Sequence, residues 1–458
     1  MCRYLDICVN LKKSRNAKDG LHQYRNITLQ QAPASLEVVI KHLMDLAEKK
    51  AESHRRKSSE VALAASTKVD DLEAVHTPES IMLSTMTKEG DAERTDREVL
   101  VPWIKFLWDT FRTVLDILRT NSKLELLYHK TAKKAFAFCQ TYGRRVEFRR
   151  LCEILRNHLT LLQKVGSAPL NVHNNKQLRG WEGWNPEAVE LHLTTRFEQL
   201  QVASEMQSWN EAFHAIEDIH ILIEINKKQP RSHLMAIYFE KLIQIFWVSD
   251  NYLFHAYASY RFYNLSVTQN RNLTTDRKEM LASAVLLSTL SIPSIVEDAE
   301  AEEKLFDFDA EKENNAKIAH LLNFSVNPRR AHLLSELIER GILDEVLPEL
   351  KLLHEILEET FDPFGLVKSA KEVIEKLKMH PELAQYIPCL EKRLVLRLLS
   401  QLTAVYRSVK IDFFHELLGD VTITSKEIEQ LVVRSVKGRQ LILRVDHMNG
   451  RATSKMSL

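Results

Sequence analysis

Apolar residues spaced three and four positions apart recur along most of the chain, and this period constrains the fold more than any other feature. Trp103, Leu107, Phe111, Val114 and Leu118 follow it, which places all five on one face of a helix. Two further stripes have similar spacing: Trp209, Phe213, Ile216, His220 and Ile223, beside Ala212 and Ala215, and Val395, Leu398, Leu402, Val405 and Val409. Each stripe must be buried against a neighbouring helix, so the sequence predicts packed amphipathic helices.

Glycine and proline are scarce. The 458 residues include 11 Gly and 12 Pro, whereas average usage would give about 32 and about 23. Strand-turn-strand folds and phosphate-binding loops depend on glycine, so the shortage argues against all-β, Rossmann and TIM-barrel architectures. Together with the stripes it predicts a solenoid of stacked helix pairs. The repeats must be degenerate, because no strict period of about 34 residues is visible.

Turn residues and polar stretches indicate where helices end. Gly20 and Gly341 are predicted to be corners between helices, and Thr77–Ser80 has the residues of a helix start. Three polar stretches are predicted to be linkers or insertions: Lys49–Asp71, which has the character of a fraying helix end, Lys164–Pro186 and Glu297–Asn315.

The last 60 or so residues have a different pattern. Three short helices are predicted in succession: Leu394–Val409, Ile411–Leu418 and Thr424–Gly438. Alternating residues at 441–445 then lead to Asn449-Gly450, a strong two-residue hairpin turn. Helices followed by a hairpin are the order of a winged helix, and we expect strands only in this part of the chain.

Charge and cysteine content exclude several classes of protein. The chain has 63 Lys and Arg against 62 Asp and Glu, so no overall field draws it to nucleic acid or to an anionic membrane. Its five cysteines are scattered without a C-x-x-C pair, which is typical of reduced thiols packed as small apolar side chains. No secretory leader is recognisable, and Ser283–Ile292 is too short and polar to span a bilayer. We expect a cytoplasmic protein with no membrane partner.

The search for catalytic and metal-binding motifs is negative. The phosphate-binding loop, the dinucleotide-binding glycine motif and the G-x-S-x-G elbow are all missing from the sequence. His354-Glu355 and His415-Glu416 each lack the second histidine of an H-E-x-x-H zinc site, and no H-x-H pair occurs. We therefore predict a non-enzymatic protein with no catalytic, metal-binding or cofactor-binding residues.

The winged-helix region carries the candidate binding residues. Residues 424–458 hold seven basic and three acidic side chains. Candidates for contact with the RNA backbone are Lys426, Arg434, Lys437, Arg439 and Arg444. Glu427 and Glu429 on the same helix would repel phosphate, so sequence-specific DNA readout is not expected. The alternative is an ordinary solvated, mildly basic face.

The predicted hairpin offers a second kind of binding. An exposed strand edge carries unpaired N–H and C=O groups, with which a neighbouring subunit can pair. The candidate partner-interface residues are Leu441, Leu443, Val445 and Arg451. A solenoid that ends in a winged helix can assemble through its helical surface and through its sheet edge, which favours a scaffold in a multi-subunit complex.

Specific segments resemble a known family. They are Asp6–Ser14, Ala17–Leu21, Gln23–Ile27, Thr77–Ser80, Arg94–Arg97, Pro102–Trp108, Trp209–Phe213, Glu217–His220, Leu286–Pro293 and Val395–Leu399. In these segments the chain resembles the family of the large "a" component of eukaryotic translation initiation factor three, which belongs to the PCI-domain proteins. The resemblance runs from Asp6 to about His447.

The resemblance implies a scaffold subunit of the factor's octameric PCI and MPN core. Such a scaffold binds partner PCI subunits through its winged helix and helical repeats. It also binds the small subunit of the ribosome, and it supports pre-initiation complex assembly and mRNA recruitment. RNA, either mRNA or rRNA, is a further implied partner, and other initiation factors would be contacted indirectly. Family members have additional N-terminal helices and a long C-terminal arm that this sequence is expected to lack, and Lys164–Pro186 is longer than the family pattern.

The expected fold class is all-α: a right-handed helical-repeat solenoid of the TPR or HEAT kind, ending in a PCI module whose winged helix contains a small β-hairpin. The expected parts are helical repeats at 1–163, an insertion loop at 164–186, helical repeats at 187–298 and the PCI module at 299–458, with the winged helix at about 394–456. Two alternatives stay open: a scaffold of the proteasome lid or signalosome, or an RNA-binding winged-helix protein. The Trp103–Trp108 segment argues against the proteasome-lid or signalosome alternative.

Overall fold

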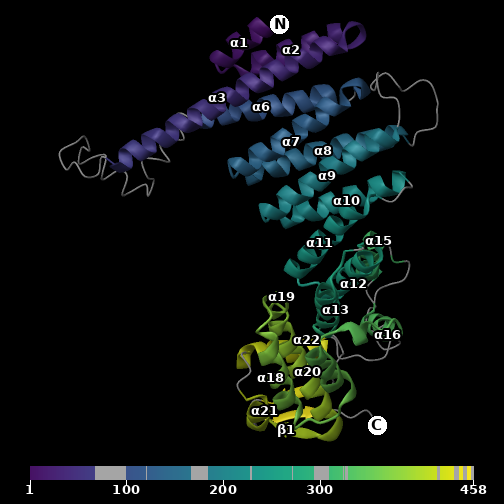
Figure 1. The fold of residues 1–458 in the computed structure, drawn as a ribbon. Helices are drawn as coiled ribbons and strands as arrows, with labels where there is room; N and C mark the ends of the chain where they lie inside the picture. The colour runs from purple at the N-terminus through teal and green to yellow at the C-terminus, as the bar shows by residue number, and fades with distance from the viewer. Residues whose placement is uncertain are drawn as a thin grey trace, which may run out of the picture. The chain divides into compact units, whose positions relative to one another are not determined.

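The computed structural model describes most of the chain (Figure 1). The described residues are 1–67, 100–119, 121–166, 184–226, 230–270, 272–292, 309–322, 324, 329–419, 423–437, 443–446 and 451–454. The chain forms two compact units, Met1–Lys228 and Gln229–Leu458.

The first unit consists of helices packed in succession. They are α1 (Cys2–Asn10), α2 (Ser14–Gln31), α3 (Pro33–Thr67), α6 (Val101–Leu118), the short 3₁₀ turn η3 (Ser122–Leu124), α7 (Glu125–Thr141), α8 (Arg145–Gly166), α9 (Pro186–Glu205) and α10 (Trp209–Asn226). α3 packs on α6, α6 on α7, α7 on α9, and α9 on α10. This succession confirms the expected helical-repeat class.

Apolar stripes form the core of the first unit. All five residues of the predicted stripe on α6 are buried. On α10 the most buried stripe is Ala212, Ala215, Ile216, Ile219 and Leu222. It is shifted from the predicted one, in which Trp209, Phe213 and Ile223 are only half-buried. The reason is that α10 packs against both α8 and α9, so its small residues are the ones that lie against these two neighbouring helices.

Two predicted breaks in the first unit are wrong. Gly20 is not a corner but lies inside α2, where an added Cβ would come within 2.6 Å of the Tyr4 ring, so glycine lets α1 approach α2 closely. The stretch from Lys49 is not a linker but the C-terminal part of a helix, because α3 continues to Thr67; its predicted character of a helix end is right. Its polar residues find partners on other helices: the His54 ring stacks on Trp103 at 4.9 Å between centroids.

Several other predictions fall partly outside the described residues. Thr77–Ser80 lies outside them entirely. In the Lys164–Pro186 stretch, α8 ends at Gly166 and α9 begins at Pro186, and residues 167–183 are not described. In Glu297–Asn315, the described part from Asp309 onward is helical. The cysteines are free thiols, four of them buried, as the sequence predicts.

The described part of the second unit begins with a series of helical segments. They are α11 (Ser232–Val248), α12 (Tyr252–Gln269), α13 (Thr275–Leu290), α15 (Asp309–Leu321), α16 (Arg330–Glu339), the 3₁₀ turn η5 (Ile342–Glu345) and α17 (Pro348–His354). Gly341 joins α16 to η5 with φ at +68°, a left-handed conformation that glycine adopts without strain, so the predicted corner is confirmed. A π-helical turn, η6 (Glu355–Glu359), follows α17, and then come α18 (Leu366–Leu377) and α19 (Pro381–Ala384).

The chain ends in a winged helix. Its elements are α20 (Ile387–Val405), β1 (Ser408–Lys410), α21 (Ile411–Leu418), α22 (Ser425–Lys437), β2 (Leu443–Asp446) and β3 (Arg451–Ser454). The strands form an antiparallel sheet in the order β1-β3-β2, so the predicted hairpin of β2 and β3 is confirmed. Its predicted two-residue turn at Asn449-Gly450 is not, because Asp446 lies opposite Arg451 and four residues separate them. β1 is a strand that the sequence analysis missed: Val409 belongs to it and not to the helical stripe. A third strand is physically reasonable there, because a two-stranded hairpin alone is only marginally stable.

None of the described helices is both long enough and apolar enough to cross a membrane.

Candidate partner and nucleic-acid interfaces

The inner face of the winged-helix sheet is apolar and faces the helices. Val409, Ala452 and Val445 lie opposite one another across the three strands. With Leu443 they line a hollow of about 130 Å³ whose other walls include Ile428 and Val432 of α22. Leu443 and Val445 are half-buried. These two predicted interface residues therefore direct their side chains into the module itself, and what they offer a partner is their backbone. Leu441 lies outside the described residues.

The edge of the sheet at β2 is open within the described part of the chain. The strand order places β3 in the centre and gives β2 a single strand neighbour among the described strands. In such an edge strand, alternate N–H and C=O groups point away from the sheet and are available for pairing with another strand.

The outer face of the sheet is basic. Side chains alternate along a strand, so the residues between the apolar ones lie on the opposite face. They include Lys410, Arg444 and Arg451, all exposed. Arg451 lies opposite Lys410 on one neighbouring strand and opposite Asp446 on the other. The candidates Arg444 and Arg451 thus share one solvent-facing surface, which we call the outer basic face.

The remaining RNA candidates lie on α22, on the other side of the sheet. Lys426 and Arg434 are exposed there, whereas the Lys437 side chain and Arg439 lie outside the described residues. Because α22 packs on the inner face of the sheet, it is separated from Arg444. The structure therefore divides the predicted RNA-binding set between two surfaces.

Glu427 has a structural role that the sequence analysis missed. The Thr424 amide donates to Glu427 Oε2 at 3.0 Å, and the Glu427 amide donates to Thr424 Oγ1 at 3.4 Å. This reciprocal pair is a capping box at the start of α22, and its T-x-x-E signature is visible in the sequence. The hydrogen bond from the Thr424 backbone is the main cause of a lowered pKa for the Glu427 carboxyl.

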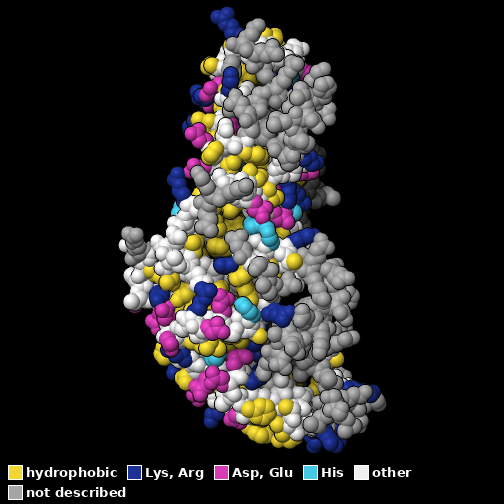
Figure 2. Space-filling view, turned by 90° about the vertical axis from the view of Figure 1, so that its right-hand side faces the viewer, with side chains coloured by type: hydrophobic (Ala, Val, Ile, Leu, Met, Phe, Trp, Pro, Cys, Tyr) yellow, Lys and Arg dark blue, Asp and Glu magenta, His cyan; other side chains and the backbone are white. Residues whose placement is uncertain are grey.

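Aromatic side chains are exposed beside the winged helix. Phe364, just before α18, is 56% exposed, and Phe413 on α21 is 39% exposed. Their ring centroids are 6.5 Å apart. Figure 2 shows a gathering of hydrophobic side chains at its lower end, the level at which Figure 1 places α21 and β1. We call Phe364 and Phe413 the exposed aromatic pair.

A basic groove lies on the first unit, between α2, α6 and α8. Its volume is about 900 Å³. Six cations line it: Arg15, Lys18, Lys105, Arg112, Arg119 and Arg150. Three acids also line it: Asp109, Asp116 and Glu153. Arg119 pairs with Asp116 at 3.2 Å, whereas the other five cations have no ion pair with any residue that the structure describes. No single stretch of the sequence reveals this groove, because its residues come from three separate helices.

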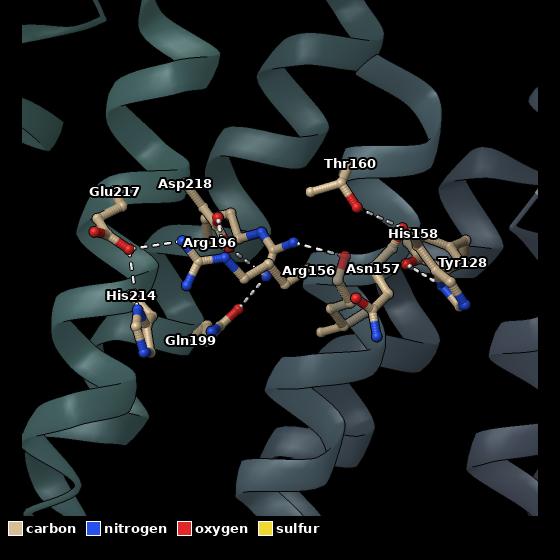
Figure 3. Close-up of polar contacts among 11 residues, drawn as sticks. Tyr128, Arg156, Asn157, His158, Thr160, Arg196, Gln199, His214, Glu217 and Asp218 are labelled. Atoms are coloured by element: carbon tan, nitrogen blue, oxygen red, sulfur yellow. Dashed lines mark hydrogen bonds and ion pairs between the residues drawn. The ribbon is translucent and has the colours of Figure 1, made fainter. Parts of the chain in front are cut away.

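A buried polar network fixes the helices behind the groove (Figure 3). Arg196 of α9 is 3% exposed. It donates to Gln199 Oε1 at 2.6 Å and to the Leu155 carbonyl of α8 at 2.8 Å, and it pairs with Asp218 of α10 at 3.3 Å. Arg156 of α8 reaches Glu217 at 2.6 Å and Asp218 at 3.4 Å. One network thus ties α8, α9 and α10 together.

Burial shifts the pKa values of two groups here, Asp218 of the network and His158 beside it. It raises the pKa of the Asp218 carboxyl, although the charges of Arg196 and Arg156 act in the opposite direction. It also lowers the pKa of His158, a groove-lining residue that meets the Tyr128 hydroxyl at 3.1 Å, to about 4. His158 is therefore neutral at physiological pH and adds no charge to the groove.

Comparison with known proteins identifies the family. The family model described as "eIF3a, PCI domain, TPR-like region" matches residues 1–365, and the "PCI domain" model matches residues 370–454. The chain is 42% identical to the A component of eukaryotic translation initiation factor 3 in Arabidopsis thaliana, over 98% of this chain and 46% of the relative. It is 39% identical to the protein of that name in Coccidioides immitis and 40% identical to the one in Emericella nidulans, each over 99% of this chain and 45% of the relative.

The chain spans about half the length of these curated relatives. The resemblance stated from the sequence is confirmed. With a family match over residues 1–365 and identity near 40% over almost all of its length, the chain belongs to the eIF3a family of PCI-domain proteins.

Proposed function

We propose that the protein is a non-enzymatic scaffold subunit of the eukaryotic translation initiation factor 3 complex. It binds other PCI and MPN subunits and the small ribosomal subunit in the cytoplasm, and so supports pre-initiation complex assembly and mRNA recruitment. Contacts with other initiation factors are indirect. In this proposal the PCI module comprises residues 299–458. The observation that carries the proposal is the open β2 edge in a module that also exposes an aromatic pair.

The open edge suits pairing with a strand of another subunit. Since the side chains of Leu443 and Val445 face the module's own interior, an incoming strand meets backbone donors and acceptors. Backbone pairing of this kind provides affinity with little dependence on side-chain identity. It fits assembly among subunits that share the PCI module.

The exposed aromatic pair can supply the specificity that an edge lacks. Aromatic side chains are enriched among the residues that carry most of the binding energy in protein interfaces. Phe364 and Phe413 lie on separate elements, before α18 and on α21. A partner that covers both rings therefore contacts more than the sheet edge alone.

Co-purification of the full chain with the other subunits of the factor tests this proposal. Replacing Phe364 and Phe413 together by alanine is expected to weaken assembly by tenfold or more. The matched control replaces Leu126 and Val146 by alanine, because these exposed apolar residues lie on α7 and α8 of the first unit. The assignment would be refuted if the aromatic variant and the control variant lost equal amounts of co-purified subunits. It would also be refuted if the wild-type chain captured no subunit of the factor.

A second function, contact with RNA, is favoured by the basic groove. Five cations without ion-pair partners in the described residues line one concave surface. Cations without an acidic partner raise the positive electrostatic potential of the groove. The phosphate backbone of RNA can pair with these cations, and binding then releases the counterions that surround the RNA. We infer that the groove contacts mRNA or rRNA, with the winged-helix candidates on α22 and on the outer basic face as two smaller basic surfaces.

The salt dependence of RNA binding, measured for variants of the groove and of the winged helix, distinguishes which of them contacts RNA. Binding of single-stranded RNA by the full chain should fall steeply with salt, by a log-log slope of about 0.7 for each phosphate contacted. Arg112→Glu in the groove should weaken binding several-fold and lower the slope. Lys130→Glu makes the same change of charge at an exposed position of α7, and it should have little effect on RNA affinity. A flat salt dependence rejects RNA binding, and a larger loss from Arg434→Glu assigns it to the winged helix.

A further inference from the structure

One glutamate and two histidines meet between α7 and α9, away from the surfaces described above. Glu125 is the first residue of α7, His129 follows one helical turn later, and His192 lies on α9. Glu125 Oε1 is 3.3 Å from His192 Nε2, and the two imidazole rings lie edge to face with centroids 4.4 Å apart. One potential ligand atom from each residue lies within 4.8 Å of the others.

His129 presents an unpaired lone pair in this cluster. The Thr195 hydroxyl donates to the Leu191 carbonyl at 3.0 Å, so its oxygen accepts from His129 Nδ1 at 2.8 Å. This assigns the proton to Nδ1 and leaves Nε2 as an acceptor. His129 is 2% exposed, and its Nε2 has no hydrogen-bond partner in the described structure. A buried polar atom without a partner needs an explanation, and a bound ion is one that suits an imidazole nitrogen.

The charges around the cluster suit a cation. Imidazole binds metals in its neutral form, and the buried His129 has it, since its Nδ1 donates to Thr195 and its Nε2 has no hydrogen-bond partner in the described structure. The nearest cations are paired elsewhere: Lys133 with Glu198 at 2.7 Å and Arg196 with Asp218 at 3.3 Å. The Glu125 carboxylate remains as a negative ligand facing two neutral ones.

We propose that Glu125, His129 and His192 bind a divalent transition-metal ion of the zinc class, with a fourth position left for water. Zinc bonds of about 2.0–2.1 Å in tetrahedral geometry place ligand atoms about 3.3 Å apart. The Glu125–His192 separation already has this value. Thr195 would hold His129 in the metal-binding tautomer, the usual role of an outer partner. The ion would link α7 to α9, and it has no part in the proposed scaffold function.

Cobalt and zinc titrations of the metal-stripped full chain test this proposal. We expect one equivalent of Co²⁺ with visible d–d bands and no thiolate charge-transfer band, because the site contains no cysteine. Zinc should displace the cobalt and raise the melting temperature of the wild-type chain. Glu125→Gln should weaken binding tenfold to a hundredfold. This variant keeps the side-chain volume at a position that is 21% exposed, so folding is preserved. His129→Gln should abolish binding.

The matched control is His158→Gln, another buried histidine of the first unit, which should leave the affinity unchanged. Absence of a stoichiometric Co²⁺ equivalent would overturn the proposal. So would binding that Glu125→Gln leaves unchanged, or a thiolate charge-transfer band, which would place the ion on cysteines. These readouts do not involve initiation-factor subunits, so failure here is distinct from failure of the scaffold function.

Discussion

Replacing Asp218 by asparagine should destabilise the first unit strongly. Asp218 is 2% exposed and faces Arg196 at 3.3 Å, so the substitution leaves a buried guanidinium with two neutral acceptors, Gln199 and the Leu155 carbonyl. Removing one partner of a buried ion pair costs about 3–5 kcal/mol. Asparagine keeps one acceptor oxygen, and the raised pKa of Asp218 means that burial offsets part of the attraction between its charge and Arg196, so we expect the lower end, about 3 kcal/mol. For a unit of 228 residues, this corresponds to a fall in Tm of about 6–12 °C.

The assay is urea unfolding of the full chain followed by tryptophan fluorescence. Five of the six tryptophans lie in residues 1–228, so the signal reports mainly on the first unit. Glu217→Gln is the matched control, because Glu217 is the next residue and its ion pair with Arg156 is one-third exposed. We expect a loss of less than about 1 kcal/mol for it. The reasoning is refuted if Asp218→Asn costs as little as Glu217→Gln.

Three further predictions concern single positions. Gly341→Ala should lower the free energy of unfolding by about 1 kcal/mol, measured by thermal unfolding, because φ at this position is +68°. Gly341→Asn should lower it less, since asparagine tolerates the left-handed conformation better than alanine. Thr424→Ala should cost about 1 kcal/mol by removing the cap of α22. Since the pKa of Glu427 is lowered in the folded state, the contribution of this cap is present at neutral pH and is lost as the pH falls through that lowered pKa. His158 is held neutral, with its pKa lowered to about 4, so the unfolded state binds the proton first and stability falls below pH 6.5. The share of this loss that His158 contributes between pH 7 and pH 5 should be about 2 kcal/mol by urea unfolding, and His158→Gln should reduce the loss by that amount, while His129 and His192, whose pKa values are also lowered, keep their own shares.

The sequence predicted those parts of the fold that depend on local spacing. The stripe on α6 and the pairing of β2 with β3 follow from periods of 3.6 and 2, and the structure confirms both, whereas the register of that pairing does not fit a two-residue turn at Asn449-Gly450. The errors arise from tertiary contacts. Gly20 serves the close approach of Tyr4, and β1 forms because β3 provides a neighbouring strand. The polar end of α3 is helical since residues such as His54 have partners on other helices.

The candidate sites were less predictable for the same reason. The groove gathers cations from α2, α6 and α8, and no sequence window contains more than part of it. Glu125 and His129 have helical spacing in the sequence, but His192 joins them only through the packing of α9 on α7. The winged-helix candidates were named from their net charge. That count could not show that the sheet separates Arg434 from Arg444.

The central claim is that this protein assembles with the other subunits through its winged helix. Hydrogen–deuterium exchange of the full chain, alone and bound to the other PCI subunits of the factor, tests this most directly. We predict that amides of β2 at Leu443–Asp446 become protected on assembly, together with peptides that contain Phe364 and Phe413. Core peptides of α6 serve as the internal reference, since they are buried in both states. Protection confined to the first unit, with unchanged exchange at β2, would contradict the account.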